Sequence, residues 1–222
     1  MEVVDYQKKL QSIREMINNS SSPTSDIAPA DVEDGLYCCV LLAEENNRHQ
    51  YGSWVNSALA KEFLGYAAML NNSVESLDSI QIAAERMADT IFDRPRLKAE
   101  LIRFRLGVLR QISPKTDKLL STIKTCEEKL LQITTNIGYA DNNEFDKIVQ
   151  KGWLKYDPVE WSARWEEVID QAEEIAYKNL SDHPRGMGFC HALWHEKRRV
   201  LCEQFGIKWR SPAMMNRGVL FD

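Results

Sequence analysis

The segment HPRGMGFCHALWHEKRRVL, residues 183–201, contains three of the four histidines of the chain, and its residue types could bind a metal ion or a phosphate group. His191 and His195 are four positions apart, so on a helix their imidazoles share one face, a common spacing for two metal ligands. The segment is not an HExxH motif, because its glutamate follows the second histidine. Only His183 or Asp182, folding back through the glycine-containing turn, could supply a third ligand.

A helix through this segment has an apolar and a polar face, at about 100° per residue. The face predicted to be buried carries Phe189, Cys190, Leu193, Trp194, Val200, Leu201 and Phe205. Arg198 and Arg199 flank the two histidines on the opposite face, where their charge would repel a divalent cation. We therefore expect no bound metal or cofactor. Three hypotheses stay open: a metal site at His191 and His195, a cationic face that meets phosphate or an acidic partner, and a solvated polar face.

A second candidate surface is a stripe of arginines. Arg96, Arg103 and Arg110 recur every seven residues, so they share one side of a helix predicted after Pro95. With Lys98 nearby, guanidinium groups about 10 Å apart could follow a phosphate backbone. The predicted buried side of this helix carries Leu97, Leu101, Phe104 and Val108. The residues expected beside the arginines, on a smooth exposed surface, are Ala99, Leu106 and Gly107. The alternative is a solvated face that acidic helices of the same bundle neutralise.

The net charge of −5 hides two basic segments on an acidic body. Residues 94–118 carry a net charge of +6 and residues 185–217 a net charge of +5, which leaves −16 for the remainder. Such segregation favours binding of an anionic partner, although solvated helix faces produce milder versions of it.

Hydrophobic periodicity predicts an all-α protein, because helical spacing recurs along the chain and no convincing alternating strand is present. The expected architecture is a multi-helix bundle in residues 1–137, a linker in 138–157, and a Trp-rich helical unit in 158–222 that ends in an extended apolar tail. Asp157 and Pro158 predict the start of a helix that buries Trp161 and Trp165 and exposes its acidic residues. Those acidic residues are Glu166, Glu167, Asp170, Glu173 and Glu174.

Motifs of common enzyme classes are absent from the sequence. It has no Walker loop, GxGxxG, GxSxG or ExxH pattern, and its five cysteines include no CxxC pair. We therefore expect a non-catalytic protein with reduced cysteines. The sequence contains no stretch of about 18 apolar residues, and its N-terminus lacks the apolar core of a signal peptide, which favours the cytoplasm.

The C-terminal run CHALWHEKRRVLCEQFGIKWRSPAMMNRGVLFD resembles the end of uncharacterised helical proteins of phages and mobile elements of gut bacteria. The resemblance covers about 33 residues and rests on the H-x-x-W-H-x-K helix, the G-I-x-W-x-S-P turn and the terminal F-D. The run SIQIAAERMADTIFDRPRLKAELIRF is loosely similar to a helix pair of small replication-associated proteins of such elements. The resemblance implies an accessory or assembly role, in the cytoplasm of a bacterial host, and transfers no site residues.

These observations lead to one functional hypothesis and two alternatives. The first is a non-catalytic accessory protein that binds nucleic acid or a nucleoprotein machine through Arg96, Lys98, Arg103, Arg110, Arg198 and Arg199. The second is a structural or inhibitory protein that binds acidic protein partners with the same surfaces. The third is a metal-dependent hydrolase centred on His191 and His195, with His183 as a further candidate ligand. The sequence leaves the identity of the partner and the oligomeric state open.

Overall fold

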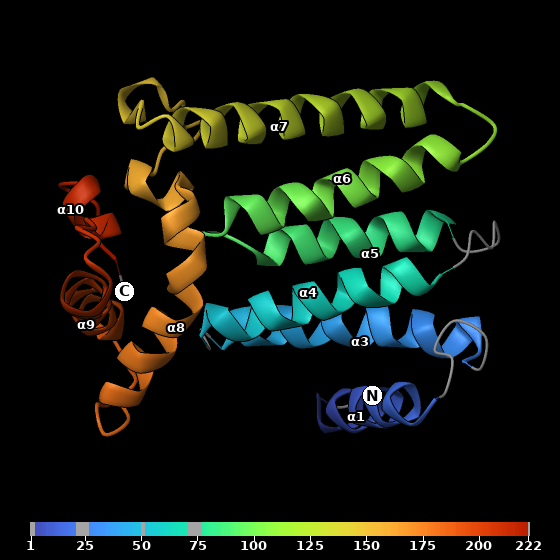
Figure 1. Cartoon of the computed structure of the whole chain (residues 1–222), viewed down its shortest axis with the longest axis horizontal. Helices are drawn as coiled ribbons and strands as arrows, with labels where there is room; N and C mark the ends of the chain where they lie inside the picture. Colours follow the sequence, from blue (N-terminus) through green and yellow to red (C-terminus); the bar gives the residue numbers. More distant parts are fainter. Residues whose placement is uncertain (1–2, 21–26, 50–51, 71–76, 222) are drawn as a thin grey trace. The chain divides into compact units, whose positions relative to one another are not determined.

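The computed structural model describes residues 3–20, 27–49, 52–70 and 77–221 (Figure 1). All regular secondary structure in these ranges is helical, which confirms the all-α prediction. None of the described helices has the length and apolarity that a membrane span requires.

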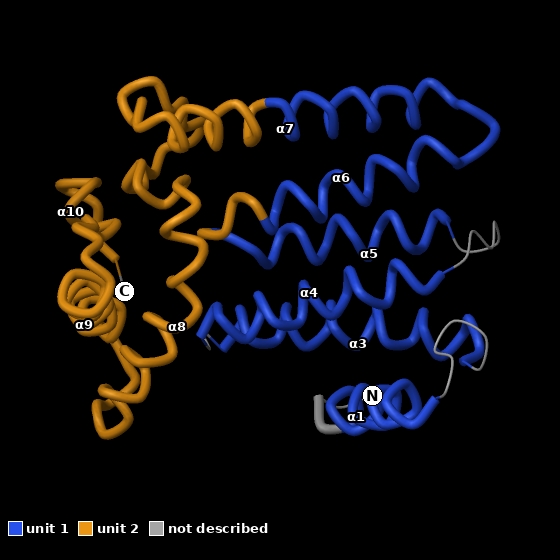
Figure 2. The backbone as a smooth tube through the Cα atoms, in the orientation of Figure 1, with its two compact units in different colours: residues 1–92, 97–131 blue, residues 93–96, 132–222 orange. Residues whose placement is uncertain are grey.

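The chain divides into two compact units (Figure 2). Unit 1 comprises residues 1–92 and 97–131, and unit 2 comprises residues 93–96 and 132–222. The division therefore falls inside the helix that ends at Asp141, whereas the sequence predicted a linker at 138–157. Residues 93–96 belong to unit 2, and the side chains of Asp93 and Arg94 bond to helices of this unit.

Unit 1 is a helical bundle. Its helices are α1 (Val3–Asn19), α3 (Pro29–Arg48), α4 (Ser53–Met69), α5 (Leu77–Thr90), most of α6 (Pro95–Gln111) and the first part of α7 (Asp117–Asp141). Helix α3 packs against α1, α4 and α5. The largest fully buried side chains of this bundle come from different helices and include Leu36, Phe63, Met87 and Leu101.

Helix α6 is covered on two sides, and one of them was predicted to be exposed. Phe104 meets the ring of Phe63 on α4 edge to face, with 6.0 Å between the ring centroids. On another side, Cys126 Sγ of α7 lies 3.7 Å from the carbonyl oxygen of Ile102. Ala99 and Leu106 share this second side with Ile102, and both are buried. The predicted smooth surface beside the arginines is therefore wrong for these two residues, because α7 packs there.

Unit 2 contains the remaining elements: η2 (Phe145–Lys147), η3 (Pro158–Trp161), α8 (Ala163–Asn179), α9 (Phe189–Phe205) and α10 (Pro212–Met215). The helix predicted to start at Asp157 is in fact two elements. Asp157 caps the 3₁₀ turn η3, and the hydroxyl of Ser162 then caps α8 by accepting a hydrogen bond from the Trp165 amide, at 3.2 Å. Trp165 is completely buried as predicted, whereas Trp161 lies in η3 and is only half-buried.

The core of unit 2 forms where α8 packs on α9. Its buried residues are Trp165, Val168, Ile169, Ala172, Val200, Leu201, Ile207 and Trp209. Gly206 ends α9 in the left-handed conformation, with a φ of 70°, and turns the chain so that Ile207 and Trp209 enter this core. The C-terminal tail thus packs against its own unit, as predicted, although Leu220 is exposed.

Candidate functional site

The arginine stripe of α6 is largely neutralised by ion pairs. Arg110 Nη2 lies 2.7 Å from Glu127 Oε1 on α7, and Arg96, which belongs to unit 2, pairs with Asp141. Lys98 donates from Nζ to the carbonyl oxygen of Ile91 at 2.9 Å, and burial lowers the pKa of Lys98. Arg103 is exposed and has no partner within the described part of the chain.

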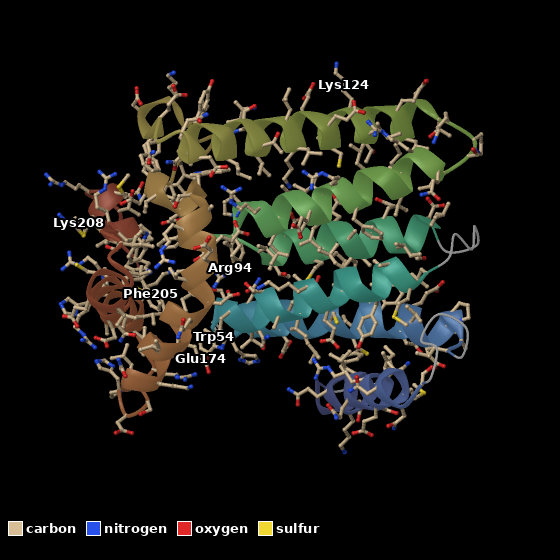
Figure 3. The ribbon with its side chains drawn as sticks, viewed as in Figure 1. Trp54, Arg94, Lys124, Glu174, Phe205 and Lys208 are labelled. Atoms are coloured by element: carbon tan, nitrogen blue, oxygen red, sulfur yellow. The ribbon has the colours of Figure 1, made fainter. Side chains whose placement is uncertain are left out.

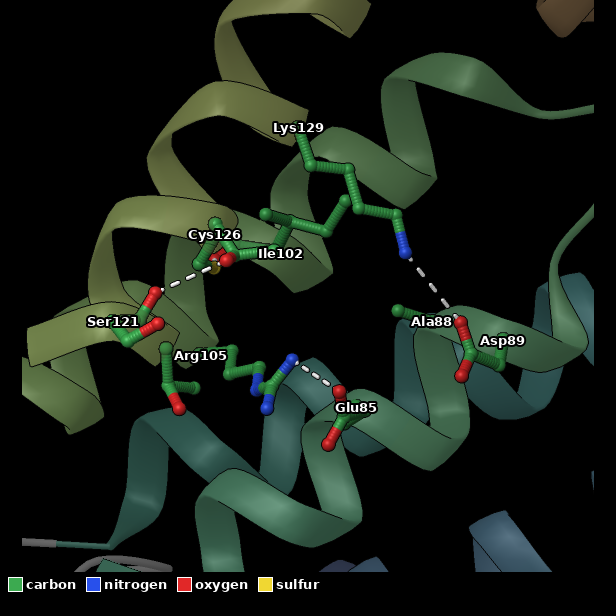
Figure 4. A pocket seen from close by; sticks show the side chains of 10 residues that line it. Glu85, Ala88, Asp89, Ile102, Arg105, Ser121, Cys126 and Lys129 are labelled. Atoms are coloured by element: carbon green, nitrogen blue, oxygen red, sulfur yellow. Dashed lines mark hydrogen bonds and ion pairs between the residues drawn. The ribbon is translucent and has the colours of Figure 1, made fainter. Parts of the chain in front are cut away.

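The groove between α5, α6 and α7 in unit 1 is also electrically balanced (Figure 4). It encloses a cavity of about 340 Å³ whose four charged side chains form two ion pairs. Arg105 Nη1 lies 2.6 Å from Glu85 Oε1, and Lys129 Nζ lies 3.6 Å from Asp89 Oδ1. Its charged groups therefore offer no net attraction to an anion.

Helix α9 places one of its basic residues in the core of unit 2, which the sequence analysis did not anticipate. Lys197 Nζ bonds to Glu173 Oε1 of α8 at 2.7 Å and to Asp93 Oδ2 at 3.1 Å. The ammonium group also lies 5.2 Å from the ring centroid of Trp165 and 5.0 Å from that of Trp209. Two carboxylates and two indole faces thus surround one cation.

Arg94 completes this buried network, and Figure 3 shows it beside α8. Its guanidinium group pairs with the adjacent Asp93, with Asp170 Oδ1 at 2.8 Å and with Glu173 Oε2 at 2.7 Å. Glu173 therefore bridges Arg94 and Lys197. The prediction that Glu173 points to water is wrong, because it carries the charge that both buried cations require.

The network shifts the pKa values of its members. Burial alone lowers the pKa of Lys197, but the carboxylates of Glu173 and Asp93 outweigh it and raise that pKa above its ordinary value. Glu160 lies near the network and accepts a hydrogen bond from Trp209 Nε1 at 2.7 Å. Burial, reinforced by the negative charge of Asp93, raises the pKa of Glu160 to about 8. At neutral pH this carboxyl group is therefore mostly protonated.

The exposed face of α9 carries both paired and unpaired cations. Arg199 lies between two carboxylates, with Nη2 2.6 Å from Glu196 Oε1 and Nη1 2.5 Å from Glu203 Oε2. The neighbouring Arg198 donates only to the thioether of Met214, at 3.2 Å. Of the two predicted arginines on α9, only Arg198 is thus without an acidic partner among the described residues.

Arg198 lines an open pocket of about 440 Å³ together with His195 and Lys208. Lys208 has no acidic partner in the described ranges, and His195 makes no hydrogen bond or ion pair there, although it lies near the carboxylate of Glu196. The hollow is also lined by the Arg199–Glu203 pair, by Cys202 and by Trp209, which is otherwise buried. This pocket, called the α9 pocket, has basic residues of the types that hold a phosphate group.

The histidines do not form a metal site in the part of the chain that the structure describes. No three histidine, cysteine, aspartate or glutamate side chains there are grouped as metal ligands would be. His191 Nε2 lies 3.2 Å from the carbonyl oxygen of Phe221, and its ring meets Trp194 edge to face. His183 Nδ1 lies 3.2 Å from the carbonyl oxygen of Pro184. The predicted ligands therefore have separate surroundings, and the hydrolase hypothesis gains no support.

Two of the buried charges missed by the sequence analysis carried a signal in their spacing. Lys197 precedes Val200 by three residues and Leu201 by four, so it lies on the apolar side of α9. Glu173 follows Ile169 by four residues and precedes Ala176 by three, so it lies on the apolar side of α8. Opposite charges on the apolar sides of two consecutive helices predict a buried pair. Helical spacing gave no signal for Lys208 of the α9 pocket, because this residue lies beyond the end of α9.

No protein-family model, curated protein or solved structure matches this chain.

Proposed function

We propose that this chain is a non-catalytic accessory protein of a phage or mobile element, and that the α9 pocket binds phosphate groups of nucleic acid. The observation that carries the proposal is the pocket lined by His195, Arg198 and Lys208, because neither Arg198 nor Lys208 has an acidic partner among the described residues. The C-terminal resemblance to phage and mobile-element proteins supports the biological context. The arginine stripe of α6 is not the main surface in this proposal, because ion pairs already occupy two of its three arginines.

Electrostatics favours a localised contact of this kind. The whole chain carries a net charge of −5, so a polyanion is repelled except where cations gather without neutralising acids. Arg198 and Lys208 provide two such charges. Trp209 lines the pocket and is also held in the core of unit 2.

The test is a binding titration of labelled single- and double-stranded oligonucleotides between about 50 and 200 mM salt. The Arg198→Ala/Lys208→Ala variant is compared with the Arg103→Ala/Arg110→Ala variant, which loses the same two charges from α6. We expect the first variant to bind more weakly and to lose about one unit of salt-dependence slope per contact, and the second to match the wild type.

Two outcomes would contradict the proposal. If the wild type does not bind any oligonucleotide at low salt, the nucleic-acid proposal is wrong and an acidic protein partner becomes the better hypothesis. If the α6 variant loses more affinity than the α9 variant, binding occurs at the arginine stripe and the assignment of the α9 pocket is wrong.

A further inference from the structure

Trp153 is the most exposed tryptophan among the described residues, with 76% of its surface accessible. Single apolar side chains are common on protein surfaces and need no explanation by themselves. Trp153 differs because its neighbouring main chain is fixed in place. The indole makes no hydrogen bond and no ring contact with any residue in the described ranges.

Two amide side chains hold the chain on either side of Trp153. Asn136, in the C-terminal part of α7, accepts from the Val149 amide at 3.0 Å and donates to the Val149 carbonyl at 2.8 Å. Gln150 does the same for Tyr156, with distances of 2.7 and 2.8 Å. Each amide thus satisfies both main-chain groups of one residue, as a neighbouring strand would. The segment that presents Trp153 is therefore ordered without burying its indole.

A third amide joins this segment to the α9 pocket within unit 2. Asn216 accepts from the Lys155 amide and donates to the Lys155 carbonyl, both at 2.7 Å. Asn216 directly follows α10, and Met214 of α10 accepts the hydrogen bond from Arg198. Helix α10 and the residue after it therefore contact both the Trp153 segment and a cation of the pocket.

The charges around Trp153 are positive. Lys151 is exposed and has no partner in the described part of the chain, and Lys155 bonds only to main-chain oxygens through its ammonium group. Residues 150–156 contain no acidic side chain. An indole face with a lysine two positions away on each side complements a base with its flanking phosphates.

We propose that Trp153 stacks on an unpaired base of single-stranded nucleic acid, while Lys151 and Lys155 contact the adjacent phosphates. This inference rests on the proposed function and adds to it the strand type that is recognised. In a duplex both faces of an internal base are covered by its neighbours, so a projecting indole cannot stack on it. A single strand exposes these faces. Stacking on one aromatic side chain is sequence-tolerant, because every base has a π-face.

The experiment titrates the full chain with a labelled oligothymidine of about 20 nucleotides and with a duplex of the same length. We expect Trp153→Ala to reduce single-strand affinity about 10–100-fold and to leave duplex affinity and the salt-dependence slope unchanged. Trp153→Phe keeps a ring and should recover most of the loss. Phe92→Ala, which removes another exposed aromatic side chain, is the matched control and should bind as the wild type does. Thermal unfolding of all variants should be unchanged, since the indole is exposed.

The outcomes separate this inference from the proposed function. If Trp153→Ala binds the single strand normally while Arg198→Ala/Lys208→Ala loses affinity, the stacking inference is wrong and the proposed function stands. Equal losses for single strand and duplex would also overturn stacking. If the wild type binds neither oligonucleotide, both proposals are wrong.

Discussion

Helices α6 and α9 both carry basic segments, yet the protein uses their charges differently. In α6, Arg105 and Arg110 each meet a carboxylate within unit 1, and only Arg103 is left exposed without a partner among the described residues. In α9, three consecutive basic residues have three different surroundings. Lys197 is buried in an ion network, Arg199 lies between two carboxylates, and Arg198 faces an open pocket.

The difference shows that a local excess of positive charge does not predict a binding surface. Residues 94–118 carry a net charge of +6, but several of their cations are paired in the folded protein. Their acidic partners come from elsewhere in the chain, such as Glu85, Glu127 and Asp141. What matters for an anionic ligand is the set of cations that the folded protein leaves without a partner. Adjacent positions such as Lys197 and Arg198 differ because a helix turns about 100° per residue.

The largest expected effect concerns the buried cation of α9. Lys197→Met keeps an unbranched side chain, and it removes the ammonium group that Glu173 and Asp93 bond in addition to Arg94. We expect the free energy of unfolding to fall by about 3–5 kcal/mol, because removing one partner strands a buried charge. The free energy of unfolding is measured by urea denaturation. Tryptophan fluorescence is the signal, since Trp165 and Trp209 flank Lys197. Arg198→Met, one residue further, is the control and should change stability by less than about 0.5 kcal/mol. Equal losses of stability for Lys197→Met and Arg198→Met would contradict the different surroundings of these two residues.

A pH-dependent effect is expected for Glu160. Its pKa rises from an ordinary value of 4.5 to about 8 in the folded protein. The stability linked to this group is therefore fully present below about pH 4.5 and is lost as the pH rises through 8, by at most about 1.4 kcal/mol per pH unit. Glu160→Gln keeps an acceptor for Trp209 and removes the titration.

The measurement compares the free energy of unfolding of Glu160→Gln and the wild type at pH 5 and at pH 8. The variant should gain stability relative to the wild type as the pH rises. A constant difference between the two proteins would show that Glu160 does not titrate between these values.

The smallest effect is expected for the exposed arginines of α6. The Arg110–Glu127 pair is exposed on both sides, so Arg103→Ala/Arg110→Ala should lower the free energy of unfolding by less than about 1 kcal/mol. Thermal unfolding at low and high salt checks this, because screening should remove most of any difference. A loss comparable to that of Lys197→Met would mean that these charges support the bundle.

Much of the fold follows from local sequence. Helix positions follow from apolar spacing and from end signals, such as Pro29 and Pro95 at the first helical positions and Gly206 after α9. The break at Ser162 was not predicted, although its signal was local. A serine three residues before Trp165 can cap a new helix, but the spacing of Trp161 and Trp165 fits one continuous helix equally well.

The sequence by itself determined that this protein is all-α and which residues of most helices are apolar, because both depend on neighbours within one or two turns. Only the tertiary structure decided which charges are neutralised. Glu173 meets both Arg94 and Lys197, at separations of 79 and 24 residues. Burial of an ion requires a partner of opposite charge in contact with it, and that partner is defined by packing between helices rather than by position along the chain.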